Sequence, residues 1–299
     1  MDGTLAWGLD FIIWVQQYSS PILDTIFRAL SFLGDETFLL LLIPFVYWTV
    51  APKIGVRLAI AFLLSGCLNV YLKGWFLEPR PFELNPAVKL SEASGYGMPS
   101  GHAQSSVVVW GILAYWLKKP WAWISAVSLM LLIGFSRIYL GVHFPTQVLA
   151  GWGVGIVFFA AYLALYPQLA AWLSPRPTGQ KLLLATAVPL VLVLVYPETE
   201  NVAAMGVLLG MGVGLALAER LVPEIPLGSW GTRALRYILG VAVIFAIYLG
   251  LKVVFPGEMS ALYAPFRFLR YGLIGLWVTL GGPWLFSLWA VTPRLRSVS

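Results

Sequence analysis

The stretch FPTQVLAGWGVGIVFFAAYLALY, residues 144–166, contains no charged side chain. A predominantly apolar run of about 20 residues is long enough to cross the hydrocarbon core of a membrane as a helix. Similar runs recur along the chain, and strand-like alternation of apolar and polar residues is absent from them. We therefore expect an all-α polytopic bundle. The expected spans are at about 37–51, 55–77, 102–117, 120–137, 144–166, 180–197, 201–219, 232–255 and 266–290.

The composition supports a membrane protein and argues against nucleic-acid binding. Of the 299 residues 60% are hydrophobic and 11% are charged, and the mean hydropathy is +0.84, values far from those of a soluble domain. The net charge of +6 comes from single or paired basic residues between apolar runs, without the dense basic stripe of a nucleic-acid site. Cys67 is the only cysteine, so no intramolecular disulfide is expected.

The N-terminal residues predict short helices at the membrane surface. Residues 5–17 are rich in Trp, Phe and Ile, and residues 22–33 place an apolar stripe opposite Asp24, Thr25 and Arg28. Such amphipathic segments are typical of helices that lie in the interface or pack against a bundle, and a true first span is the alternative. No cleavable signal peptide is expected, because the N-terminus is not basic.

A proline- and glycine-rich break at residues 174–179 divides the chain into two expected domains. Residues 1–175 hold every polar cluster and form the expected core of about five spans. Residues 179–299 form an accessory bundle of about four spans. Within it, the glycines between Gly206 and Gly214 include a Gly-x3-Gly spacing that favours close helix packing, with a lipid groove or dimer contact as the alternative.

The distribution of Lys and Arg predicts which side of the membrane each loop faces. Basic residues near short loops favour the cytoplasmic side, and most of those in this chain fall on one side of the predicted bundle. Lys252, Arg267 and Arg270 run against this pattern. The opposite side receives segments 78–100 and 137–143, which we expect to face the exterior or periplasm of a bacterial inner membrane.

Three polar clusters on that side contain both histidines of the chain. They are Lys73-x6-Arg80-Pro81, Pro99-Ser100-Gly101-His102 and Ser136-Arg137-x5-His143. Ionisable residues within membrane-spanning regions are costly and by default functional. The cations can grip an anion, the amides that begin the helix after Ser100 can bind phosphate, and two imidazoles can supply a nucleophile and an acid. The clusters therefore predict a phosphate site.

These clusters resemble the tripartite signature of the type 2 phosphatidic acid phosphatase family, membrane enzymes that remove phosphate from lipid phosphates or pyrophosphates. The resemblance spans roughly residues 36–166 and implies that His143 is the nucleophile and His102 the general acid. It also implies that no metal or other cofactor is required. The residues that it implies in phosphate binding are Lys73, Arg80, Ser100, Gly101 and Arg137.

One position departs from the family pattern. The family has an Asp four residues after the nucleophilic His, whereas this chain has Gln147. Its amide oxygen can accept a hydrogen bond from His143 and fix the tautomer, but it cannot stabilise an imidazolium by charge. Loss of the carboxylate from a related His-Asp pair costs about 10⁴-fold in rate. Either activity is reduced or another acid compensates, and the candidates on the same side are Asp35, Glu36, Glu92, Glu198 and Glu200.

The expected function is hydrolysis of a lipid phosphate or pyrophosphate through a phosphohistidine intermediate. Hydrophobic access between spans would leave the lipid chain in the bilayer. One alternative is a phosphotransferase, which passes the phosphoryl group to another acceptor. The other, motivated by Gln147, is a catalytically weakened lipid-phosphate binder or transporter. The sequence does not specify the lipid or the oligomeric state.

Overall fold

The computed structural model describes residues 3–223 and 225–291, and the regular secondary structure of these residues is entirely helical. The all-α prediction is confirmed. Residues 1–40 and 64–166 form one compact unit, called here the N-terminal unit, and residues 41–63 and 167–299 form a second, the C-terminal unit. The expected division between residues 1–175 and 179–299 stays a prediction.

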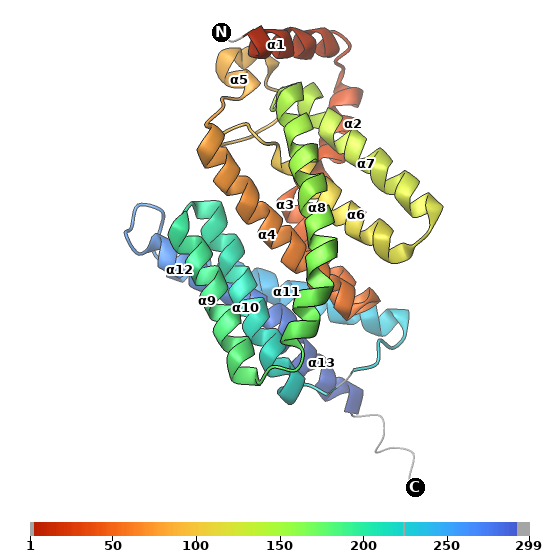
Figure 1. Ribbon diagram of the computed structural model, residues 1–299, viewed down its shortest axis with the longest axis vertical. Coiled ribbons are helices and arrows are strands. Elements are labelled where there is room, and N and C mark those ends of the chain that lie inside the picture. Colours follow the sequence, from red (N-terminus) through yellow and green to blue (C-terminus); the bar gives the residue numbers. More distant parts are fainter. Residues whose placement is uncertain (1–2, 224, 292–299) are drawn as a thin grey trace. The chain divides into compact units, whose positions relative to one another are not determined.

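Helices follow one another through both units, with short connections between most of them (Figure 1). In chain order they are α1 (Gly3–Gln16), α2 (Pro21–Phe32), α3 (Glu36–Phe45), η1 (Val46–Val50), α4 (Pro52–Phe76), α5 (Pro81–Leu84), η2 (Pro86–Val88), α6 (Gly101–Leu117), α7 (Pro120–Tyr139), α8 (Pro145–Leu173), α9 (Thr178–Val195), α10 (Thr199–Leu221), α11 (Trp230–Val254), α12 (Tyr263–Leu276), η3 (Trp277–Gly281) and α13 (Gly282–Val291).

In the N-terminal unit, α6 packs closely against α8 because the facing residues of α8 are small. A side chain at Gly151 would meet the carbonyl oxygen of Ser100, and one at Gly155 would meet α6 at Gln104 and Val107. A buried polar contact joins α6 to α4, since the Gln104 amide donates to the backbone and hydroxyl oxygens of Ser65 at 2.7 and 2.8 Å. These contacts fix the position of the N-terminus of α6.

The N-terminal helices α1 and α2 are short and carry exposed apolar side chains. At 14 and 12 residues they are shorter than the roughly 20 that a span requires. Ser20 accepts a hydrogen bond from the Leu23 amide and Pro21 follows it, so Ser20 caps the start of α2. The polar face of α2 contacts the bundle, because Asp24 accepts a hydrogen bond from the Tyr139 hydroxyl at 2.6 Å.

In the C-terminal unit, α10 and α12 lie against each other through glycines (Figure 1). A side chain at Gly206 or Gly210 would collide with the backbone of α12, at the carbonyl oxygens of Phe268 and Gly272 respectively. The glycine run therefore serves close packing between helices of this chain. The segment before α4 also belongs to this unit, where the Trp48 indole donates to the Val278 carbonyl at 3.0 Å.

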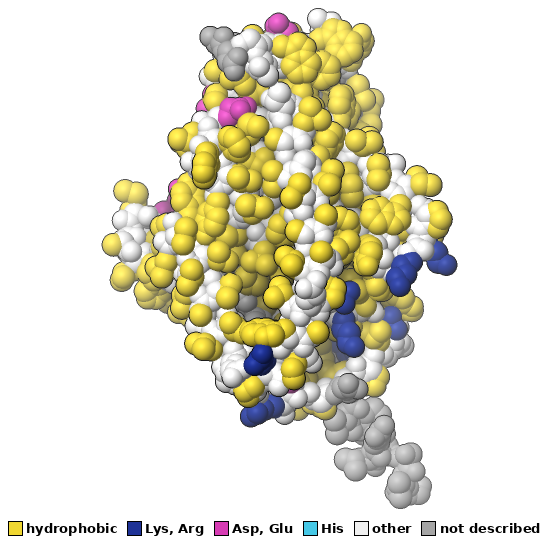
Figure 2. Space-filling model, viewed as in Figure 1, with side chains coloured by type: hydrophobic (Ala, Val, Ile, Leu, Met, Phe, Trp, Pro, Cys, Tyr) yellow, Lys and Arg dark blue, Asp and Glu magenta, His cyan; other side chains and the backbone are white. Residues whose placement is uncertain are grey.

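The helices meet the length and apolarity that a membrane requires. Seven helical stretches among the described residues are long and apolar enough to cross a bilayer, or eight if the bent pair of Pro21–Phe32 and Glu36–Val50 is one span. Many large apolar side chains on them are exposed, and hydrophobic side chains cover most of the face shown in Figure 2. The protein is an integral membrane protein. The seven stretches are Pro52–Leu84, Pro120–Tyr139, Pro145–Leu173, Thr178–Val195, Thr199–Leu221, Trp230–Val254 and Tyr263–Leu288.

Candidate active site

All the site residues expected from the sequence lie in the N-terminal unit. Lys73 is in the last turn of α4, Arg80 caps the start of α5, and Arg137 is in the last turn of α7. Ser100 caps α6, so that Gly101 and His102 are the first residues of that helix. His143 lies in the connection between α7 and α8, and Gln147 is in the first turn of α8.

Arg80 links the loop before α6 to His143. Its side chain is buried, and its Nε and Nη2 donate to the carbonyl oxygens of Gly95 and Ser94 at 2.7 and 2.8 Å. Its Nη1 donates to the carbonyl oxygen of Val142 at 2.9 Å and lies 3.0 Å from Nε2 of His143. Two distant parts of the signature therefore meet, as the sequence predicted.

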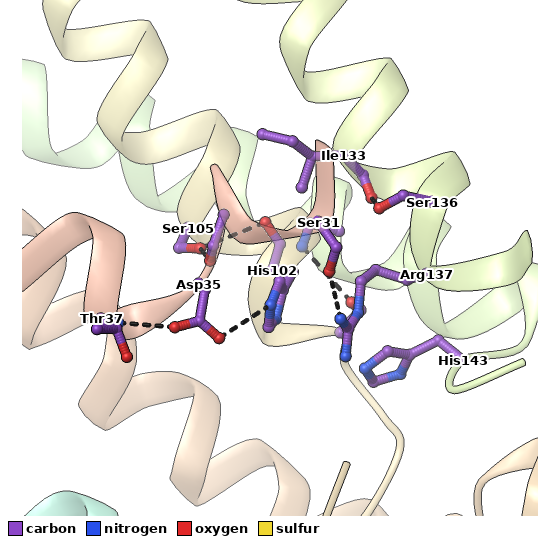
Figure 3. Close-up of polar contacts among 12 residues, drawn as sticks. Ser31, Asp35, Thr37, His102, Ser105, Ile133, Ser136, Arg137 and His143 are labelled. Carbon is purple, nitrogen blue, oxygen red and sulfur yellow. Dashed lines mark hydrogen bonds and ion pairs between the residues drawn. The ribbon is translucent and has the colours of Figure 1, made fainter. Parts of the chain in front are cut away.

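Arg137 lies beside His143 and is held by α2 (Figure 3). It is buried, and its Nη1 donates to the hydroxyl oxygen of Ser31. Its Nε is buried and has no hydrogen-bond partner among the described residues. A buried guanidinium N–H without a partner is costly, so a hydrogen bond that it donates to an anionic ligand would lower the free energy.

The start of α6 presents its first turn to the same region. Ser100 is fully buried, its hydroxyl oxygen accepts from the Ala103 amide at 3.5 Å, and its own amide donates to the carbonyl oxygen of Gln147 at 3.0 Å. A side chain at Gly101 would lie 3.2 Å from the Asn69 side-chain oxygen, so the position has little room for one. A helix N-terminus held in this way favours an anion.

Gln147 fixes the tautomer of His143. Its Oε1 lies 3.1 Å from Nδ1 of His143 and accepts from the Phe144 amide at 3.2 Å. Its Nε2 donates to Oε1 of Glu78 and to the carbonyl oxygen of Pro79, both at 2.8 Å. Reversing the amide would turn its NH2 toward the Phe144 N–H and its oxygen toward two acceptors. Nδ1 of His143 is therefore the protonated nitrogen, and Nε2 carries the lone pair.

The surroundings of His143 keep its imidazole neutral. Burial lowers the pKa of His143 well below its ordinary value of 6.5, and the positive charges of Arg80, Arg137 and Lys73 lower it further. A nucleophilic histidine reacts as the neutral imidazole, so the buried site favours the form of His143 that could act as a nucleophile. Lys73 is therefore close enough to His143 for its charge to act on the imidazole.

Asp35 is the carboxylate that reaches His102. Its Oδ2 lies 3.7 Å from Nε2 of His102, and its Oδ1 accepts from the Thr37 amide at 2.8 Å (Figure 3). Asp35 was one of the candidate acids expected to compensate for Gln147, but it contacts the other histidine. Another candidate, Glu92, pairs with Lys89 at 2.7 Å.

The acid beside Gln147 is Glu78, which the sequence analysis missed. Glu78 lies inside the first cluster, two residues before Arg80 and five after Lys73. Its position within that cluster was the available signal. Glu78 also begins segment 78–100, which was expected on the same side of the membrane as the other candidates.

Comparisons with known proteins agree with this arrangement. The sequence matches the PAP2 superfamily over residues 54–171, and the PAP2 superfamily phosphatase, transmembrane extension, over residues 202–294. Phosphatidylglycerophosphatase B of Bacillus subtilis (strain 168) is 32% identical over 152 residues, which cover 46% of this chain and 73% of that protein. The chain belongs to the PAP2 superfamily. The resemblance drawn from the three clusters is confirmed.

Other relatives match smaller or similar shares of the chain. Undecaprenyl-diphosphatase of Sulfolobus acidocaldarius is 38% identical over 106 residues, which cover 34% of this chain and 50% of that protein. The crystal structure of a transmembrane PAP2 type phosphatidylglycerolphosphate phosphatase from Bacillus subtilis aligns with a TM-score of 0.50 at 26% identity. That alignment covers 56% of this chain and 88% of that structure. These relatives are phosphatases, and the PAP2 fold carries the candidate site in this chain.

Proposed function

We propose that this PAP2 protein hydrolyses a phosphomonoester or pyrophosphate on a membrane lipid, with His143 as the nucleophile. The proposal rests on the tautomer and position of His143. Its Nδ1 is protonated, and its Nε2 lone pair lies beside the buried guanidinium of Arg80. A nucleophile among cations is suited to an anionic phosphorus centre and poorly suited to a neutral one.

The phosphate is held by cations and by the start of α6. Lys73, Arg80 and Arg137 neutralise charge on the phosphoryl oxygens, and the unpartnered Nε of Arg137 becomes a donor to one of them. The amides after Ser100, including that of Gly101, add donors at a helix N-terminus. This set stabilises the negative charge that develops during phosphoryl transfer.

The reaction proceeds in two displacements. Nε2 of His143 forms a bond to phosphorus while the bond from phosphorus to the lipid oxygen breaks, and His102 donates a proton to that oxygen. Water then attacks the phosphohistidine, and His102 takes back a proton as the N–P bond breaks. Gln147 holds Nδ1–H of His143 throughout. No metal is needed, because the three cations supply the charge stabilisation.

The substrate class follows from the relatives and from the apolar surface around the site. Phosphatidylglycerophosphatase B and undecaprenyl-diphosphatase are named for lipid substrates, and exposed apolar side chains such as Trp75 and Phe76 follow Lys73 on α4. We infer that the lipid chain stays in the bilayer while its phosphate enters among the cations.

A phosphate-release assay over a panel of lipid phosphates and pyrophosphates in detergent tests this proposal. Release of free phosphate that disappears in His143→Ala and persists in excess EDTA is the expected result. Transfer of labelled phosphoryl to an added lipid or sugar, with little free phosphate, would indicate a phosphotransferase instead. Release that is unchanged in His143→Ala would contradict the proposal.

We propose that the site faces the periplasm or exterior of a bacterial inner membrane. The turn between α6 and α7 carries Lys118 and Lys119, whereas His102 and Arg137 lie at the other ends of the same two helices. Basic loops favour the cytoplasm. A Lys119→Cys variant should resist a membrane-impermeant maleimide in intact cells, while Glu92→Cys should react. Both are compared in a Cys67→Ala background, and the reverse pattern would contradict this orientation.

A further inference from the structure

The amide of Gln147 is neutral, so it cannot balance the positive charge that develops on His143 during the proposed reaction. When Nε2 of His143 bonds to phosphorus, the imidazole ring gains positive charge and its Nδ1–H becomes a stronger donor. Gln147 accepts that hydrogen bond but carries no charge to balance it. The nearest carboxylate along this hydrogen-bond chain is that of Glu78, one amide group away.

Glu78 is held in place by the chain around it. Leu77 ends α4 at a φ of +51°, in the left-handed region that a leucine rarely adopts, and this turn brings Glu78 back toward α8. The carbonyl oxygen of Glu78 accepts from the Gly97 amide at 2.8 Å. Gly97 also packs flat against the Gln147 amide, which any side chain at that position would overlap. Backbone strain of this kind persists only where the surroundings fix it.

A hydrogen bond to a carboxylate polarises the amide that donates it. As Nε2 of Gln147 donates to Glu78, electron density shifts toward Oε1, which makes that oxygen a better acceptor for Nδ1–H of His143. Chains of hydrogen bonds strengthen one another in this way in a low-dielectric site. The charge of Glu78 therefore reaches His143 without direct contact.

We propose that Glu78 is a positioning residue that acts on His143 through Gln147, in place of a carboxylate in direct contact with the imidazole. This inference rests on the proposed role of His143 as nucleophile. Glu78 does two things: it selects the orientation of the Gln147 amide, and it stabilises the imidazole ring as positive charge develops on it.

Isosteric substitutions at the two positions test the proposal. Glu78→Gln keeps an oxygen for the Gln147 amide and removes the charge. We expect kcat/KM to fall about 10- to 100-fold, mainly in kcat, the range reported for hydrogen-bond partners of metal-bound histidines. Glu83→Gln is the matched control, because Glu83 is an exposed acid in the neighbouring helix α5, and its activity should match that of the native protein.

The decisive measurement is the effect of Glu78→Gln in a Gln147→Glu background. Gln147→Glu alone places two carboxylates in contact, which is unfavourable. Adding Glu78→Gln lets an amide donate to the new carboxylate at position 147, so that a charge touches His143 directly. We expect Glu78→Gln to lower activity in the native background and to raise it in the Gln147→Glu background. The Pro79 carbonyl oxygen would still repel a carboxylate at position 147, so we do not expect the double variant to regain native activity. The test is whether Glu78→Gln has opposite effects on activity in the two backgrounds.

A readout that is independent of activity separates this inference from the proposed function. The chain has two histidines, so selective 15N-histidine labelling gives two sets of ring signals, which His143→Ala assigns. The substituted side chain still offers an oxygen to the Gln147 amide, so we expect the Nδ1–H tautomer of His143 in both proteins. We expect the Nδ1–H proton signal of His143 to move to lower chemical shift in Glu78→Gln, because its hydrogen bond to Gln147 weakens. If the signal moves but no lipid phosphate is hydrolysed by the native protein, the proposed function fails and the positioning role stands. If the signal and the activity are unchanged in Glu78→Gln, the positioning role is wrong.

Discussion

Ser31 of α2 accepts a hydrogen bond from Nη1 of Arg137 in the last turn of α7, across a separation of 106 residues in the chain. The helix α2 is therefore part of the candidate site. The same face of α2 carries Asp24, bonded to Tyr139, and Arg28, bonded to the carbonyl oxygen of Leu90. A helix that is apolar on its outer face thus supports the groups around the phosphate with its polar face.

Ser31→Ala should weaken phosphate binding without unfolding the protein. Loss of its hydroxyl leaves a buried guanidinium donor without a partner, which costs the folded state roughly 1–3 kcal/mol. The Arg137 side chain is then free to leave its position beside His143, so kcat/KM should fall. Steady-state phosphate release measures the effect. Thr25→Ala is the matched control on α2, since the Thr25 hydroxyl is exposed and donates to the Pro21 carbonyl within its own helix. Equal activity of the two variants would show that α2 does not position Arg137.

The pH dependence of kcat/KM should respond to the charge of Lys73. Nucleophilic attack needs neutral His143, and the pKa of His143 is held below 6.5 by burial and by nearby cations that include Lys73. Protonation of His143 therefore causes loss of activity only at a pH below 6.5. In Lys73→Met the pKa rises, so the acidic limb of log(kcat/KM) should move to higher pH.

The substrate complicates this measurement, because the second ionisation of a phosphomonoester lies near pH 6. The native protein and the variant are therefore compared on one substrate, so that its ionisation contributes equally to both profiles. A reduced rate with an unchanged acidic limb would mean that Lys73 binds phosphate without influencing His143.

Asp35→Asn should reduce the ability of His102 to protonate the leaving oxygen. The carboxylate lies 3.7 Å from Nε2 of His102 and favours its protonated form, whereas asparagine keeps the acceptor for the Thr37 amide. The loss in kcat should be large for an alkyl phosphate. It should be small for an aryl phosphate, whose leaving group needs no proton. An equal loss on both substrates would point to a structural role for Asp35 at the start of α3.

One contact that the sequence predicted is local. His143 and Gln147 are four residues apart at the start of a helix, so their hydrogen bond follows from helical geometry. The approach of Arg80 to His143, 63 residues apart in the chain, was expected because the resemblance assigns both residues to one phosphate site. The helical fold followed from apolar runs whose lengths match a bilayer.

The contacts that were missed join segments far apart in the chain. Glu78 lies 69 residues from Gln147, in a connection between helices that has no periodic pattern. The direction of the Glu78 side chain depends on the positive φ of Leu77. A leucine in the sequence does not indicate a positive φ, since this residue rarely adopts one. Likewise the polar face of α2 indicates that a polar group or water contacts it, but not which one. The tertiary packing brings Arg137 to Ser31 on this face.

Packing in the C-terminal unit gives a prediction about stability. Gly210 faces the backbone of α12, and a Cβ at this position would overlap the carbonyl oxygen of Gly272. Because the obstacle is backbone, no change of side-chain rotamer can make room. Gly210→Ala must separate α10 from α12, and we expect a loss of about 1–3 kcal/mol, the usual cost of overpacking a core. Gly250→Ala in α11 is the control, because its Cβ meets no atom within 4 Å. Thermal unfolding in detergent should show a lower Tm for Gly210→Ala alone. If the two variants have the same Tm, the close contact between α10 and α12 does not require glycine at position 210.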